Sequence, residues 1–147
     1  MAQQRDGIVQ DYATLKTSST HYSGVFYNNS VAMMNMGSWF IPTVIKEIAA
    51  GKTEVKNWGI VKYPHAPGVA PGTTLGTITS LGVSNASKKK DAAFDFVKFV
   101  CGSEGAQIVA ATGTSPALVN DQVANVIASL PGFPTDPASK EALHTAK

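Results

Sequence analysis

Cysteine, charge and long apolar runs are all scarce in this sequence. The 147 residues hold one cysteine, Cys101, whereas a disulfide framework or a zinc site built from cysteines would need several thiols. Only 15% of the residues are charged, 12 basic and 10 acidic, so the chain lacks the clustered basic face that nucleic-acid binding requires. No apolar stretch reaches the roughly 18 residues that a membrane-spanning helix needs. We therefore expect no internal disulfide, no nucleic-acid partner and no membrane span in these residues.

The apolar residues that are present suffice for a folded core. Leucine, isoleucine, valine and phenylalanine make up 34 of the 147 residues, and a chain of this length corresponds to about one domain. The 13 glycines and 8 prolines predict many tight turns. The neighbouring Phe99 and Val100 predict that the thiol of Cys101 is buried.

The first half of the chain has the pattern of a β-α-β unit. Residues 31–36 form a short, nearly continuous apolar run, which is typical of a strand buried on both faces of a parallel sheet. Apolar residues then repeat with helical spacing over residues 41–49, and Gly51 supplies the end of that helix. Residues 58–63 are predicted to be a second strand. The predicted fold class is therefore α/β.

The second half alternates between a loop, an extended segment and helices. Three prolines and two glycines make residues 64–72 a surface loop, and the β-branched residues of 75–83 predict an extended segment. Two amphipathic helices are expected next, capped by Ser87 and Ser103. A third is expected around residues 123–130, followed by an irregular tail punctuated by prolines.

Residues that could carry catalysis are scarce. The three histidines, His21, His65 and His144, lie far apart in the sequence, and no metal-ligand spacing is visible. No G-x-S-x-G elbow and no phosphate-binding loop occurs. We expect no catalytic residue, no metal and no cofactor.

One segment is a candidate for binding. Gly37, Ser38 and Trp39 follow the first predicted strand and open the helix, the place where open α/β sheets bind ligands. An indole offers a flat apolar platform for a sugar ring, and free amides at a helix start can donate to hydroxyls. A tryptophan packed in the core beneath the helix explains the same pattern equally well. Trp58, within a strand pattern, is expected in the core.

Six short motifs occur in a fixed order over about residues 22–120. They are Phe26–Met33, Gly37–Trp39, Trp58–Ile60, Leu81–Ser84, Ala92–Phe99 and Ser103–Gln107. Together they resemble the carboxyl-terminal half of family 1 extracellular solute-binding proteins, the maltose-binding-like receptors of ABC sugar importers. Asn29 departs from the family, which usually has glycine at this turn.

The resemblance implies a fragment of a two-lobed periplasmic-binding-protein type II fold, in which two α/β lobes close on a ligand. By this correspondence residues 1–75 belong to the second, carboxyl-terminal lobe. Residues 76–119 would supply a hinge strand and helices of the first lobe, and residues 120–147 would return toward the second. The family chain is far longer, so a fragment is expected to expose apolar surface and to self-associate.

The resemblance also implies a function. The chain would belong to the solute-binding component of an ABC transporter, which binds a mono- or oligosaccharide for import and is not an enzyme. Trp39 would stack on the sugar beside Gly37 and Ser38, while the backbone of Gly76 and Thr77 would line the cleft. The implied partners are the carbohydrate and the permease subunits. The implied location is periplasmic or extracellular, with a cell-surface lipoprotein as one form.

Other functions stay open on the sequence. A receptor of the same fold could bind a different solute, such as a polyamine or a glycerol phosphate. A phosphate would require an arginine in the cleft, and the one arginine of the chain is Arg5. An enzyme whose catalytic residues lie in other parts of a longer protein and an interaction module that keeps the fold and binds no solute are further alternatives.

Overall fold

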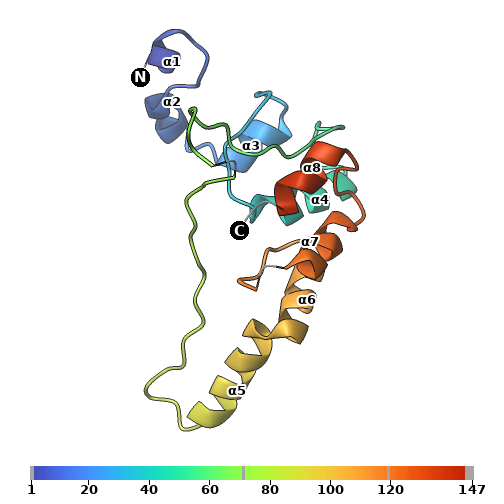
Figure 1. Ribbon diagram of the computed structural model, residues 1–147. Coiled ribbons are helices and arrows are strands. Elements are labelled where there is room, and N and C mark those ends of the chain that lie inside the picture. The colour runs from blue at the N-terminus through green and yellow to red at the C-terminus, as the bar shows by residue number, and fades with distance from the viewer. Residues whose placement is uncertain (1, 71, 119, 145–147) are drawn as a thin grey trace.

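The structure is a computed structural model that describes residues 2–70, 72–118 and 120–144. Within these residues the regular structure is helical, and no strand occurs. Figure 1 shows the helices joined by long irregular segments. They are α1 (Ala2–Arg5), α2 (Tyr12–Thr17), α3 (Tyr22–Tyr27), α4 (Phe40–Ala49), α5 (Lys90–Cys101), α6 (Ser103–Ala111), α7 (Asp121–Ala128) and α8 (Pro137–His144).

The prediction of an α/β fold class is wrong for this chain. Residues 31–36 and 58–63, the two predicted strands, form no backbone hydrogen bonds to one another, and no sheet exists in the described part of the chain. A strand needs a neighbour that pairs with its N–H and C=O groups. The apolar pattern predicted strands at these positions. The described residues supply no partner strand with which either segment could pair.

Helix α4 confirms the helix predicted over residues 41–49. Its apolar stripe faces inward, so that Ile41 and Val44 are buried. Pro42 lies in the first turn, where its missing N–H costs no helical hydrogen bond. Gly51 follows the helix with φ at +66°, the left-handed conformation that ends many helices.

Helices α5 and α6 are also confirmed, with different caps. The side-chain oxygen of Ser87 accepts a hydrogen bond from the N–H of Lys89, but α5 begins one residue later without a side-chain cap. Gly102, rather than Ser103, is the N-cap of α6. No residue of α5 is buried. In the described residues α6 is the one helix with which α5 makes extensive contacts, so the other faces of α5 stay uncovered. The prediction of a buried thiol is wrong for the same reason, since Cys101 is exposed.

The core lies where α4, α6 and α7 meet. Asn120 caps α7 by accepting a hydrogen bond from the N–H of Val123 at 2.9 Å. Trp58, predicted to lie in the core, is only partly buried and packs against it, with its ring edge-on to that of Phe133. The buried members of the core are Ile41, Ala106, Ala110, Val123, Ile127 and Phe133.

Helix α8 was not expected in the proline-containing tail. Pro137 is its first residue, and a carboxylate oxygen of Asp136 accepts from the N–H of Ser139 at 2.9 Å. Hydrogen bonds from Ser139 lower the pKa of the Asp136 carboxyl group. The buried Ser139 hydroxyl in turn accepts from the N–H of Ile60 at 2.7 Å. One predicted strand is therefore held by a helix rather than by another strand.

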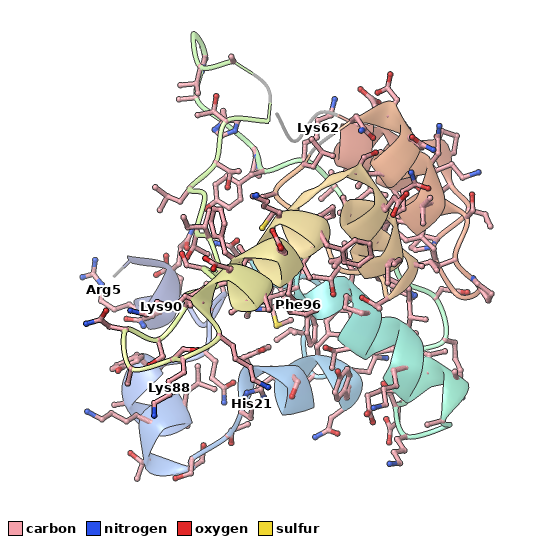
Figure 2. All side chains as sticks on the ribbon, turned by 90° about the horizontal axis from the view of Figure 1, so that it is seen from below. Arg5, His21, Lys62, Lys88, Lys90 and Phe96 are labelled. Atoms are coloured by element: carbon pink, nitrogen blue, oxygen red, sulfur yellow. The ribbon has the colours of Figure 1, made fainter. Side chains whose placement is uncertain are left out.

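An ion pair supports the same contact. Lys62 lies beside α8, as Figure 2 shows, and its ammonium group pairs with the carboxylate of Glu141. This pairing lowers the pKa of the Glu141 carboxyl group.

Candidate functional site

The predicted binding segment lies at the start of α4. Trp39 directly precedes the helix, and 51% of its surface is exposed. The indole folds back over Gly37, where a methyl group would overlap its six-membered ring. The structure therefore brings Gly37 and Trp39 together, with Ser38 exposed between them. The alternative of a core tryptophan is not what the structure shows.

The free amides belong to the three residues that directly precede the helix. The N–H of Phe40 donates to the carbonyl of Gly37 at 3.0 Å, and that of Ile41 donates to Ser38 at 3.1 Å. These two bonds engage the first amides of the helix. The amides of Gly37, Ser38 and Trp39 donate to no group in the described residues. Three donors thus lie next to an exposed aromatic ring.

Aromatic rings anchor this corner of the molecule. Phe40, which is buried, meets the rings of Tyr22, Phe26 and Tyr27 at centroid distances of 5.5, 5.8 and 5.8 Å. The three rings come from α3, in which Tyr22 and Phe26 lie one turn apart and Tyr27 directly follows Phe26. Because Phe40 is fixed among them, the backbone of Trp39 is held in place.

This cluster was missed in the sequence. The one-turn spacing of Tyr22 and Phe26 was the available signal, but only the structure shows that three rings of α3 converge on Phe40. The side chain of Thr53 and the N–H of Glu54 both donate to the carbonyl of Tyr27, at 2.9 and 3.0 Å. These bonds join the end of α3 to the segment that follows α4. Tyr22 keeps 38% of its surface exposed.

The Tyr27 phenol is the one group of this corner with a perturbed acidity. Burial raises its pKa, and the nearby Glu47 and Tyr22 raise it further. Its hydroxyl is buried without a hydrogen-bond partner in the described residues. The phenol therefore stays neutral at physiological pH and keeps a proton to donate.

Gly76 and Thr77 lie elsewhere. Both are exposed, and no atom lies within 4 Å of the position that a Cβ of Gly76 would take. They belong to the long irregular segment that runs apart from α4 in Figure 1. The structure does not bring them to Trp39, and their role stays a prediction.

Replacing Gly37 with alanine is expected to displace the indole of Trp39 and to leave stability nearly unchanged. The added methyl group would overlap the ring, which can rotate away at an exposed site. The free energy of unfolding should change by less than about 0.5 kcal/mol. Tryptophan emission should shift to longer wavelength, measured in a Trp58→Phe background. Gly76→Ala, at a site with open space, is the matched control and should leave the emission unchanged. An unshifted emission in Gly37→Ala would contradict the packing of the ring on Gly37.

The site has the chemistry of a binding surface. It offers an exposed ring for stacking and unengaged amides for hydrogen bonds. No group of three or more histidine, cysteine, aspartate or glutamate residues in the described part of the chain could hold a metal ion. Within the same residues, no helix is both long and apolar enough to cross a bilayer. Stacking and hydrogen bonds are how proteins hold small polar ligands.

The particular family follows from comparison with known proteins. The profile of the family described as "Bacterial extracellular solute-binding protein" matches residues 2–140, so the chain belongs to this family. The resemblance to extracellular solute-binding proteins is confirmed, as is the predicted periplasmic or extracellular location. No curated protein matches the chain significantly.

A solved structure extends the comparison. The crystal structure of a sugar transporter from Rhizobium etli, in an open conformation, is 55% identical to this chain, with a TM-score of 0.86. The match covers 99% of this chain and 37% of that protein. The chain therefore spans little more than a third of the length of this relative, and takes the arrangement that the corresponding residues have there.

Proposed function

We propose that this chain forms part of the carbohydrate-binding cleft of a receptor that delivers sugar to an ABC importer. Its family and the sugar transporter that it resembles support this function. The observation that carries the proposal is the half-exposed Trp39 beside three unengaged amides at the start of α4. We also propose that the chain acts without catalysis, and that permease subunits receive the loaded receptor.

Each candidate residue has a distinct role in this proposal. The indole of Trp39 stacks on the apolar C–H face of the sugar, and the amides of Gly37 and Ser38 donate to its hydroxyls. Tyr22, whose half-exposed ring packs on Phe40, adds a second aromatic surface at the same corner. These groups form one wall of the cleft.

The opposite wall belongs to the other lobe. We place residues 1–75 and 120–147 in the second lobe and residues 76–119 in the first, with Gly76 and Thr77 where the chain crosses between lobes. The boundary at residue 119 lies outside the described residues. The long segment through Gly76 in Figure 1 has the extended path that such a crossing requires.

Charge favours a neutral ligand. Arg5 lies on α1, which is apart from α4 in both Figure 1 and Figure 2. A phosphate-bearing solute would need the paired N–H donors of an arginine guanidinium group close to the stacking ring. A neutral sugar needs only the ring and the amides.

Replacing Trp39 with alanine is expected to weaken sugar binding about tenfold, because the stacking surface is lost. The change is made in a chimera in which this chain replaces the matched segment of the Rhizobium etli protein. Isothermal titration with a panel of mono- and oligosaccharides measures the affinity.

Trp39→Phe is the matched control, since it keeps a ring at the same position. Its loss of binding free energy should be less than half of the loss in Trp39→Ala. Circular dichroism checks that all proteins are folded. Equal affinities of the unmodified chimera and Trp39→Ala would contradict the stacking role. If the folded chimera binds no sugar at all, the proposed substrate class is wrong.

A further inference from the structure

A series of ring contacts joins a histidine to the start of α4. The imidazole of His21, labelled in Figure 2, lies against the ring of Tyr22 with a centroid distance of 4.1 Å. The ring of Tyr22 meets that of Phe40 edge-on at 5.5 Å. Phe40 is the first residue of α4 and directly follows Trp39. The contacts therefore lead from a titratable ring to the residue beside the stacking tryptophan.

His21 also caps the helix from which the other rings come. It is the N-cap of α3, where its Nδ1 accepts a hydrogen bond from the N–H of Ser23 at 3.4 Å and lies 2.6 Å from the Ser23 hydroxyl oxygen. This acceptor engages an N–H that has no partner within the helix. Helix α3 has only six residues, and a helix of this length has little stability of its own. The cap therefore contributes to holding the rings of α3 around Phe40.

The cap depends on the protonation of the imidazole. The lone pair of Nδ1 accepts a hydrogen bond only while this nitrogen carries no proton. A doubly protonated ring can still donate to the hydroxyl of Ser23, but it no longer accepts from the N–H, and its positive charge lies at the helix end that disfavours cations. Histidine is the side-chain type that changes charge between about pH 5 and 8. The cap is therefore complete at pH 7.5 and is lost as the pH falls toward 5.

The other titratable groups around these rings are phenols and carboxylates. They are Tyr22 and Tyr27 on α3, Glu47 on α4, and Glu54, whose N–H donates to the carbonyl of Tyr27. Burial, and then the charge of Glu47, raises the pKa of Tyr27. Phenols ordinarily titrate near pH 10 and carboxyl groups near pH 4. Within the described part of the chain no ion pair involves His21.

We propose that His21 is a positioning residue for Trp39, and that its protonation weakens sugar binding as the pH falls from about 7.5 to 5. Loss of the cap loosens the first turn of α3, which carries Tyr22, and the contact of this ring with Phe40 is lost with it. The backbone of Trp39 is then less firmly held. The effect on binding rests on the proposed function, in which Trp39 stacks on the sugar.

Tryptophan emission of the whole 147-residue chain tests the positioning without sugar. In a Trp58→Phe background, the emission maximum should move to longer wavelength between pH 7.5 and 5. In His21→Asn it should stay at its pH 7.5 position, because asparagine is a strong N-cap acceptor that does not titrate. His65→Asn is the matched control and should keep the shift, since the ring of His65 lies against Tyr63 and not against the rings of α3. Circular dichroism checks that each variant is folded.

Sugar affinity tests the consequence. Isothermal titration is made at pH 7.5 and 5 on the chimera in which this chain replaces the matched segment of the Rhizobium etli protein. The dissociation constant should rise about three- to fivefold at pH 5, since loss of an N-cap acceptor has an effect of this size. In the His21→Asn chimera it should rise less than twofold. The comparison removes the contribution of every other group that titrates in the chimera.

Each other outcome would count against the proposal. An emission maximum that does not move with pH, or one that still moves in His21→Asn, would overturn the positioning role of His21. Loss of the shift in His65→Asn would assign it to the wrong histidine. Equal losses of affinity in the two chimeras would overturn the effect on binding. A folded chimera that binds no sugar at either pH would overturn the proposed function and the effect on binding with it, while the emission profile still decides whether His21 positions Trp39.

Discussion

Replacing Ile127 with alanine should lower the free energy of unfolding by about 3 kcal/mol. Ile127 lies on α7 and is 2% exposed, at the place where α4, α6 and α7 meet. Deleting a buried side chain of this size removes its transfer free energy and leaves a cavity, which together cost about 2–5 kcal/mol. Because domains are typically stable by only about 5–15 kcal/mol, this is a large share of the total.

Urea unfolding followed by helical circular dichroism measures this loss. Ile108→Ala is the matched control, because it removes the same atoms from a helix position that is 59% exposed. It should cost less than about 1 kcal/mol. Similar losses in both variants would contradict the assignment of the core to the junction of the three helices.

The helices were the most predictable part of this fold. The apolar spacing that fixes α4 is local, so the buried Ile41 and Val44 follow directly from the sequence. Helix α8 was missed although Asp136 and Pro137 carry a recognisable start signal, an acceptor followed by proline in the first turn. The prolines at residues 131, 134 and 137 favour an irregular chain, and that pattern outweighed the start signal.

That residues 31–36 and 58–63 form no sheet was not predictable from the same kind of pattern. An apolar run such as residues 31–36 shows that the chain can be extended, but the partner of a strand is fixed by residues distant in sequence. Ile60 illustrates the point, since its N–H is bound by the hydroxyl of Ser139, 79 residues further on. No local pattern could have indicated that pairing.

The candidate site was predictable in its residues and not in its packing. The position of Trp39 at the start of a helix followed from the sequence. That its ring lies on Gly37, and that Phe40 is held by three rings from α3, follows only from the tertiary contacts. The packing of α4 against the rest of the core therefore decides where the stacking ring stands.

Gly113 is the residue on which that placement should depend most, and Gly113→Ala should cost about 3 kcal/mol. Its φ of +87° is unfavourable for a residue with a side chain, by about 1–2 kcal/mol. A Cβ at this position would also lie 3.0 Å from the Cβ of Pro42 and 3.4 Å from a methyl carbon of Leu130. Overpacking of this kind costs about 1–3 kcal/mol.

A second glycine separates the two causes. Gly68 has a φ of +92° and open space around it, so Gly68→Ala should show the backbone strain alone, about 1–2 kcal/mol. The excess loss in Gly113→Ala then measures the contact with Pro42 in the first turn of α4. Since Pro42 lies three residues after Trp39, only Gly113→Ala should also change tryptophan emission in the Trp58→Phe background. Equal losses in urea and unchanged emission would mean that the end of α6 does not position the start of α4.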